Sequence, residues 1–206
     1  MKYLLKAFTC ICAMFFIGCG GLIKSEYAPI NYYRLQASAP LKTSASLPGT
    51  LMVRTFYTNA QYDSDDMFST TGGAISNPYQ YHKWVSATPE LVTDFIVNRL
   101  STSQLFSRGV VASGSASAAE YILEGKVLDM LAETDERGSG IVHLQMQVSL
   151  IKTSSNMLIM QKIYDKKVNR NTSAIVSIAE SLSEAMTQVT DEMASDIAIA
   201  VQTGGK

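Results

Sequence analysis

The sequence predicts a single α/β domain in which two main helices pack on a mixed sheet. Side chains 141–151 alternate between apolar and polar, a period of two that is typical of a strand with one buried face. Residues 91–100 and 178–201 instead place apolar side chains every three or four positions, as amphipathic helices do. Both patterns lie in one chain of 206 residues, which is long enough for one substantial core.

The first twenty residues predict a lipoprotein signal peptide. Lys2 and Lys6 lead into an uncharged apolar run of about 11 residues, whereas roughly 20 are needed to span a bilayer as a helix. The run ends in Phe16-Ile17-Gly18-Cys19, which resembles a bacterial lipobox with Phe16 at a position that usually carries Leu or another aliphatic residue. The alternative is an ordinary signal peptide cut elsewhere, with no role for Cys19.

The lipobox predicts how the mature chain is organised. We expect residues 1–18 to be removed, Cys19 to carry the lipid, residues 19–28 to form a lipidated tether, and residues 29–206 to form the domain. Several acyl chains, palmitate among them, anchor a protein durably where one chain binds only marginally. Gly20, rather than Asp, after the cysteine favours the periplasmic face of the outer membrane.

Composition excludes several classes of function. The chain carries 17 basic and 18 acidic side chains, so it lacks the basic excess expected of a nucleic-acid-binding protein. Of its three cysteines only Cys19 lies outside the predicted signal peptide, so we expect neither a disulfide nor a thiolate metal site in the domain. No cofactor is expected.

The sequence predicts short strands around one helix in the first half of the domain. Residues 30–35 and Thr50–Tyr57 are β-prone, and two shorter strands at 67–70 and 79–85 flank a turn at Gly72-Gly73. The aspartates at 63, 65 and 66 have a spacing that suggests calcium. However, the glycine and the distal glutamate of an EF-hand loop do not follow, so a solvated acidic turn is the better interpretation.

Capping signals and periodicity define the two helices. Thr88-Pro89-Glu90 predicts an N-cap, a first-turn proline and a first-turn acid for a helix that runs through Leu100 and is followed by a short strand at Val110-Val111. Ser177 and Glu180 fit a capping box for the long final helix, whose start could also lie at Ser173. Its methionine-bearing stripe predicts packing on the sheet rather than a groove-binding surface.

Between the helices, residues 120–168 predict an antiparallel meander. The strand at 120–133 is apolar and should be central, the strand at 141–151 follows, and a turn at 153–156 leads into residues 157–168. Lysines in the last strand indicate an exposed edge (Lys162, Lys166 and Lys167).

The sequence shows no catalytic constellation. The two histidines, His82 and His143, stand apart, and no nucleophile-elbow, metalloprotease or phosphate-loop motif is present. We therefore expect a non-enzymatic binding protein. Three aromatic residues before the first helix, Tyr79, Tyr81 and Trp84, are candidates for partner binding. For Trp84, packing onto the sheet at its rim is the favoured interpretation and a binding hot spot is the alternative.

The order of these features resembles the ABC-type transport auxiliary lipoprotein family, the lipoprotein partners of MCE-type (mammalian-cell-entry) lipid transporters. The resemblance rests on the lipobox, Tyr32-Tyr33-Arg34-Leu35, the strand at 51–56, Tyr62-Asp63, Trp84 before the first helix, Tyr121-Ile122-Leu123-Glu124-Gly125 and the final helix. Val85-Ser86 stands where the family tends to Ala and an acidic residue, and the loop after Asp63 is long.

The resemblance implies a fold and a role. The fold would be a mixed sheet of about five strands with helices packed on it, similar to anticodon-binding and TolB N-terminal domains. The role would be an outer-membrane lipoprotein that docks a periplasmic MCE protein, and through it an ABC transporter, to move phospholipid between the membranes. A homo-oligomer is compatible with an exposed edge strand.

A regulator of peptidoglycan synthesis is the alternative function. Such outer-membrane lipoproteins usually carry a long tether that crosses the periplasm. The segment 20–28 is too short for that reach, because an extended residue covers at most about 3.6 Å. The short tether favours a domain held close to its own membrane.

Overall fold

The computed structural model describes residues 28–37, 39, 41, 46–71, 75–135 and 140–204. Cys19 and the Gly72-Gly73 turn lie outside the described residues. The elements follow in this order: β1 (Asn31–Tyr33), β2 (Leu51–Val53), β3 (Tyr57–Thr58), the 3-10 helix η1 (Ala60–Tyr62), β4 (Asp66–Thr70), β5 (Ser76–Trp84), α2 (Thr88–Thr102), β6 (Val110–Ala112), β7 (Tyr121–Thr134), β8 (Gly140–Lys152), β9 (Met157–Asn169) and α3 (Val176–Thr203).

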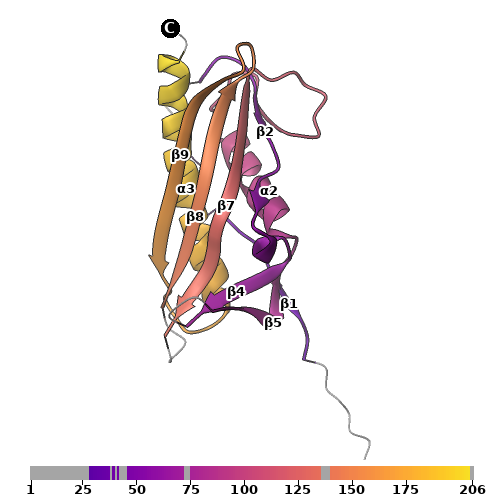
Figure 1. Cartoon of the computed structure of the whole chain (residues 1–206), viewed down its shortest axis with the longest axis vertical. Coiled ribbons are helices and arrows are strands. Elements are labelled where there is room, and N and C mark those ends of the chain that lie inside the picture. The colour runs from indigo at the N-terminus through magenta and orange to yellow at the C-terminus, as the bar shows by residue number, and fades with distance from the viewer. Residues whose placement is uncertain are drawn as a thin grey trace, which may run out of the picture.

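One mixed sheet organises the described chain, with β7 at its centre (Figure 1). On one side β7, β8 and β9 form the predicted antiparallel meander. On the other side β7 pairs in parallel with β2, β3 and β4 along its length. The sheet continues from β2 to β6 and from β4 through β5 to β1. The α/β class is confirmed.

The sheet of the described residues holds nine strands rather than about five. The difference comes from strands of two or three residues, such as β3 and β6, which carry too few positions for a periodic pattern. Their pairing to β7 and β2 is a tertiary event, because each partner lies far away in the sequence.

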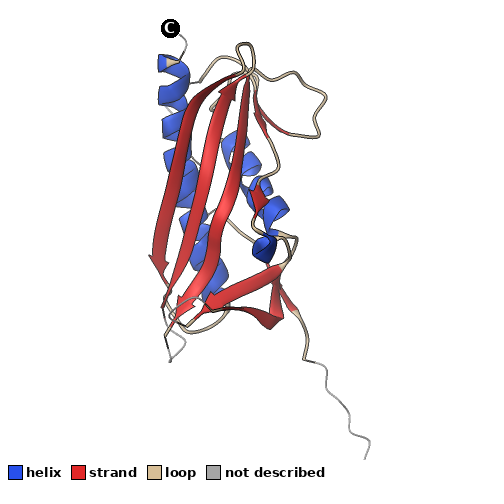
Figure 2. Cartoon of the chain, viewed as in Figure 1, coloured by secondary structure: helices blue, strands red, loops and turns tan. Residues whose placement is uncertain are grey.

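Both helices cover the same face of the sheet (Figure 2). The apolar positions of β8, among them Leu144, Met146 and Val148, are fully buried, as the period of two predicts. The stripe of α3 that includes Met186, Val189 and Met193 is equally buried in the same core. The predicted docking of both amphipathic patterns on the sheet is confirmed.

The predicted strand at Thr50–Tyr57 is broken into β2 and β3. Between them the chain turns inward, and Phe56 is 1% exposed. Its backbone N–H donates to Thr93 Oγ1 of α2 at 2.8 Å instead of joining the ladder. A buried aromatic ring and a helix hydroxyl therefore interrupt a segment whose local propensity favours a continuous strand.

Neither predicted side-chain cap forms. The N-cap of α2 is Ala87, and Thr88 is a buried first-turn residue. In α3 the N-cap is Ile175, so Ser177 lies inside the helix. The Ser177 hydroxyl bonds to the carbonyls of Thr172 and Ala174 and accepts from buried Arg170, and these tertiary partners replace the capping box.

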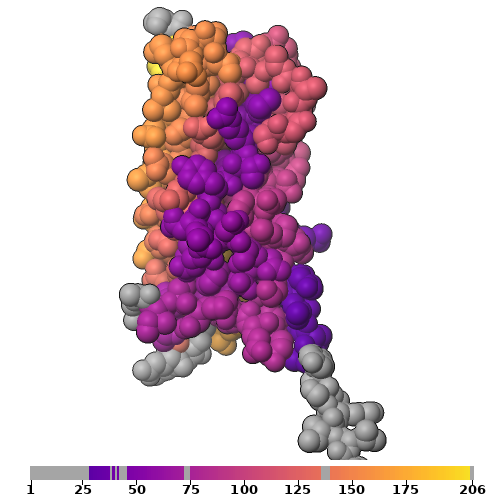
Figure 3. Space-filling view, turned by 45° about the vertical axis from the view of Figure 1, so that its right-hand side comes forward, coloured from indigo at the N-terminus to yellow at the C-terminus, as the bar shows by residue number. Residues whose placement is uncertain are grey.

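The open face of the sheet carries a small second cluster where η1 covers β4 and β7. Tyr62, Phe68 and Leu131 are buried there together, and the two rings meet edge to face with centroids 5.4 Å apart. The Tyr62 hydroxyl donates to Asp129 Oδ1 at 3.2 Å. Burial, followed by the charge of Asp129, raises the pKa of Tyr62. Figure 3 shows this early part of the chain, in violet, spread over the face beside the orange meander.

The described chain begins and ends at opposite ends of the long axis (Figure 1). β1 lies at the lower end of this view, where the chain enters the fold. The C-terminal end of α3 and the β8–β9 hairpin lie at the upper end, and a Cβ on Gly204 would touch Ile159 of β9.

Candidate partner-binding surface

The aromatic candidates lie on β5, whose pairing with β4 is irregular. Asp66 pairs with Lys83, yet Phe68 pairs with Pro78, so residues 79–82 face a single residue of β4. Such a bulge leaves side chains out of the ladder and redirects them. The bulged segment is also held by β1, which places Asn31 beside His82 and Tyr33 beside Trp84 in a parallel pair.

The bulge separates the three predicted binding residues. Trp84 is 2% exposed and belongs to the core. Tyr79 is half-buried, with its ring edge-on to His82 at 6.2 Å between centroids. Tyr81 is 41% exposed, so of the three only its side chain stands mainly at the surface. Their role in partner binding stays a prediction.

Two exposed residues of the N-terminal segment, which the sequence analysis did not select, lie next to Tyr81. Ile30 is 46% exposed and Tyr32 is 60% exposed. The β1–β5 register brings both to the bulged strand, and the hydroxyl of Tyr33, which faces the other way, lies 2.9 Å from His82 Nδ1. The alternation of side chains in β1 could have indicated that Ile30 and Tyr32 face away from Tyr33. It could not have indicated which strand β1 pairs with.

Two aspartates near residue 65 form ion pairs with one lysine of β5. Lys83 Nζ lies 2.9 Å from Asp65 Oδ1 and 2.8 Å from Asp66 Oδ1. The hydrogen bond that Lys83 donates to Asp66 is the main cause that raises the pKa of Lys83, and the same bond is the main cause that lowers the pKa of Asp66. The acidic turn is therefore tied to the sheet beside the aromatic bulge.

A groove runs between α2 and the segment that follows β1. It has a volume of about 530 Å³ and is lined by Leu35, Ala37, Leu91 and Phe95 among others, with Arg99 in its wall. The lining is mostly apolar because this part of α2 presents its helical stripe toward the N-terminal segment.

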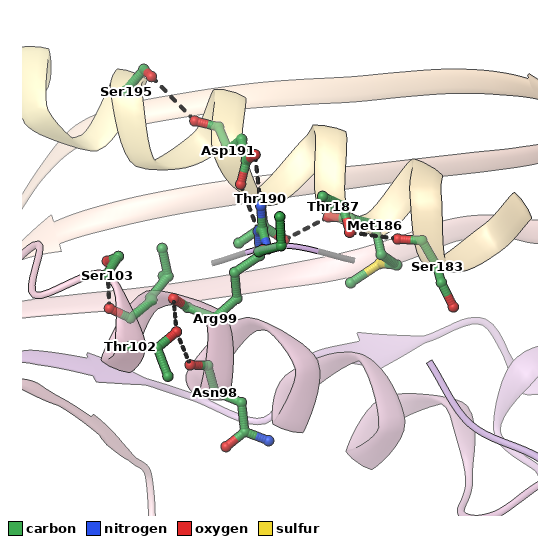
Figure 4. A network of polar contacts seen from close by, with 12 residues as sticks. Asn98, Arg99, Thr102, Ser103, Ser183, Met186, Thr187, Thr190, Asp191 and Ser195 are labelled. Carbon is green, nitrogen blue, oxygen red and sulfur yellow. Dashed lines mark hydrogen bonds and ion pairs between the residues drawn. The ribbon is translucent and has the colours of Figure 1, made fainter. Parts of the chain in front are cut away.

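Arg99, in the wall of this groove, connects α2 to α3 (Figure 4). Its guanidinium donates from Nε and Nη2 to the two carboxylate oxygens of Asp191, at 2.6 and 2.7 Å. Its Nη1 donates to the carbonyl of Ala39 at 2.7 Å. The arginine side chain is 4% exposed and that of Asp191 is 39% exposed. This two-pronged bond fixes both helices and the N-terminal segment relative to one another.

A polar cluster marks the open face of the meander. His143 of β8 lies 2.9 Å from Asp165 and 3.6 Å from Glu133, and Lys167 pairs with Glu133 at 3.1 Å. A hydrogen bond from Gln145 is the main cause that lowers the pKa of Asp165. Each charged group of this cluster has a partner, as expected of a solvated sheet face.

Within the described residues, no cluster of His, Cys, Asp and Glu has the geometry to hold a metal ion. Among these same residues, no helix combines the length and the apolar character needed to cross a bilayer. The features that stand out are thus a surface of aromatic and apolar side chains and a fixed helix pair, which suit binding.

The sequence profile described as ABC-type transport auxiliary lipoprotein component matches residues 33–194, which is most of the chain. The chain belongs to this family. Its members are auxiliary components of transport, a non-enzymatic kind of protein, and they are lipoproteins, which indicates a membrane-anchored chain with transporter partners. The resemblance inferred from the sequence is confirmed, and no curated protein matches the chain.

Two solved structures share the fold of this family member, and a third is a more distant match. A Xanthomonas campestris protein of the DUF330 family superposes with a TM-score of 0.76 at 15% identity, covering 85% of this chain and 98% of the other. An uncharacterized protein gives a TM-score of 0.63 at 13% identity, covering 82% and 99%. PelC from Paraburkholderia phytofirmans, solved as a dodecamer, gives 0.46 at 11% identity, covering 76% and 96%.

Proposed function

We propose that this family member is an outer-membrane lipoprotein that docks an MCE-type periplasmic protein of an ABC transport system, and that the system moves phospholipid between the inner and outer membranes. The observation that carries the proposal is the family match over residues 33–194. The lipobox ending in Cys19 supports the lipid anchor, and Gly20 after it supports the outer-membrane destination.

The proposed role is structural. ATP would be hydrolysed by the cytoplasmic subunits of the transporter, and this chain would supply a rigid platform. Its two helices are joined by the Arg99–Asp191 ion pair and packed on one sheet face, which suits a docking subunit. Tyr79 and Tyr81 remain proposed contact residues of the platform, whereas Trp84 supports them from the core.

A pull-down with membrane fractionation tests this proposal. The full-length chain and a Cys19→Ala variant are expressed in a deletion strain, membranes are solubilised in detergent, and co-purified proteins are identified. We expect the full-length chain to recover an MCE protein and to fractionate with the outer membrane. The variant should lose the outer-membrane location, because it lacks the lipidated cysteine.

Two outcomes would contradict the proposal. Recovery of a penicillin-binding protein in place of an MCE protein would favour the regulator of peptidoglycan synthesis. An intact lipid-transport phenotype in the deletion strain, together with defective peptidoglycan synthesis, would point the same way. A Gly20→Asp variant is the matched control for destination, since it keeps Cys19 and changes only the adjacent sorting position.

A further inference from the structure

Four apolar side chains stay exposed where the chain enters the fold. Ile30, Tyr32, Tyr81 and Val176 are between 41 and 60% exposed. The parallel β1–β5 register pairs Asn31 with His82, so the residues just before them, Ile30 and Tyr81, lie side by side. Tyr32 and Val176 line one hollow between β1 and the first turn of α3. We call these four residues the anchor-end surface.

The hollow beside this surface has a volume of about 490 Å³ and an amphipathic lining. Arg34 and Glu180 contribute the charges, and Val176 and Ala179 contribute apolar atoms. Lys83, which pairs with Tyr32 in the ladder, is held by Asp65 and Asp66, so it is not free to bind phosphate and this group of three carries one net negative charge.

The position of the lipid-bearing residue decides which occupant fits. Ala28, the first described residue, follows Cys19 by about nine residues, which span at most about 30 Å when fully extended. Ile30 and Tyr32 are thus among the first side chains of the fold after the tether. A membrane that holds the lipid of Cys19 lies within reach of this end.

We propose that the anchor-end surface rests on the phospholipid headgroup layer of the membrane that holds the Cys19 lipid. The inference rests on the proposed function, because it requires the anchor. Tyrosine suits that layer, since its ring enters the apolar boundary while its hydroxyl stays hydrated. Ile30 and Val176 add apolar area, and the Arg34 guanidinium matches the geometry of lipid phosphate.

Contact at this end orients the whole domain. The β8–β9 hairpin lies at the far end of the long axis and carries two exposed apolar residues, Met157 and Leu158. With the anchor-end surface on the lipid, this hairpin points away from the membrane. In this orientation Tyr81 contacts lipid instead of the protein partner proposed for it above, and Tyr79 keeps the proposed partner contact.

Site-directed fluorescence on the lipidated full-length protein tests the inference. The protein is reconstituted in vesicles of phosphatidylethanolamine and phosphatidylglycerol and isolated by flotation. A polarity-sensitive dye is attached at Gln80→Cys, beside Tyr81, or at Ser155→Cys, in the far hairpin turn; both positions are exposed. Lipidation occupies the Cys19 thiol, so each variant offers one free thiol.

We expect the dye at position 80 to shift to shorter wavelength on vesicles relative to detergent, and to be quenched by spin-labelled headgroups. The dye at position 155 should show neither effect. Adding Ile30→Ser and Tyr32→Ser should abolish the shift at position 80 while the protein still floats. Unchanged emission of Trp84, the single tryptophan, verifies that this variant is folded.

Each other result overturns the inference in a recognisable way. If the protein floats but the dye at position 80 shows no shift, or the dyes at both positions shift equally, the lipid anchor is supported and the proposed contact of the anchor-end surface with lipid is wrong. A shift at position 80 that requires an added envelope extract would assign the surface to a protein partner. If the protein does not float, the anchor fails, and with it the proposed function.

Discussion

At the scale of single residues, Gly125 marks a point of β7 where no side chain fits. A Cβ there would overlap the ring of Phe56 and would lie 2.7 Å from the carbonyl oxygen of Gln147. Phe56 is the residue that breaks the predicted strand between β2 and β3. The inward turn at Phe56 and the glycine opposite therefore depend on each other.

We predict that Gly125→Ala destabilises the protein by about 1–3 kcal/mol, the usual cost of overfilling a packed core. Gly114→Ala is the matched control, because no atom lies within 4 Å of its added Cβ, and it should change stability by less than about 0.5 kcal/mol. Urea-denaturation midpoints of the two variants measure the difference. Equal midpoints would show that Phe56 can move aside at little cost.

At the scale of elements, the Arg99–Asp191 pair holds α2 against α3. Removing one partner of a fully buried pair costs about 3–5 kcal/mol, whereas an exposed pair contributes under about 1 kcal/mol. Arg99 is buried and Asp191 is half-exposed, so this pair falls between the two cases.

We predict that Asp191→Ala lowers the free energy of unfolding by about 2 kcal/mol, since among the described residues the Arg99 guanidinium then keeps only the Ala39 carbonyl as a partner. Glu184→Ala, on the same helix and bonded to the neighbouring Gln188, should cost less than about 0.5 kcal/mol. The double variant Arg99→Met, Asp191→Leu should recover part of the loss. Chemical denaturation of all three tests this, and similar losses for Asp191→Ala and Glu184→Ala would contradict it.

The β9–α3 contact carries a network of ion pairs that titrates with pH. Glu192 lies 2.8 Å from Lys162 and 2.7 Å from Lys166, and Lys162 also pairs with Asp196. The hydrogen bond from Lys162 is the main cause that lowers the pKa of Glu192 below its ordinary value of 4.5. The charged form thus stabilises the fold above that value, and this stabilisation is lost as pH falls through the folded-state pKa.

We predict that in Glu192→Gln the free energy of unfolding falls less steeply than in the parent protein as the pH drops below 4.5. At pH 7 the variant should lose only about 0.5–1 kcal/mol, because Glu192 and Lys162 are each more than a third exposed and solvent screens their interaction. Denaturation midpoints at a series of pH values measure both effects. Glu184→Gln should keep the pH profile of the parent protein, and an unchanged profile for Glu192→Gln would refute the prediction.

At the scale of the whole molecule, β9 is an edge of the described sheet and leaves one row of its backbone groups without a strand partner. Ile163 stands on the open face of this edge, 56% exposed, opposite Gln147 and near Asp165. An exposed apolar edge favours pairing with another chain. The homo-oligomer expected from the sequence would have a natural contact here.

We predict that Ile163→Lys reduces self-association of the detergent-solubilised protein and changes its stability by less than about 0.5 kcal/mol. Light scattering coupled to gel filtration measures the association, and a melting curve measures the stability. Gln161→Lys, on the same face of β9, controls for added charge. Equal behaviour of the two variants would place self-association elsewhere on the molecule.

Local sequence patterns predicted those helices and strands that are long enough for the pattern to repeat several times. The alternation along β8 and the three-to-four spacing along α3 each recur over many residues, and both buried faces agree with the prediction. The same reasoning selected Tyr79, Tyr81 and Trp84 together, since they stand close in the sequence. It set Trp84 apart as a packing residue, but it could not separate Tyr79 from Tyr81, because the bulge that does so depends on how β5 pairs with β4.

By itself the sequence determined the α/β class, the meander, the positions of both helices and the family, since each depends on local periodicity or on a contiguous motif. The lipobox stays a prediction. Only the tertiary structure decided the parallel pairing of β2, β3 and β4 with β7, the inward turn at Phe56 and the burial of Trp84. These features arise when segments distant in the chain compete for one core. Packing and hydrogen-bond satisfaction then outweigh local propensity, which differs among residues by only about 1 kcal/mol.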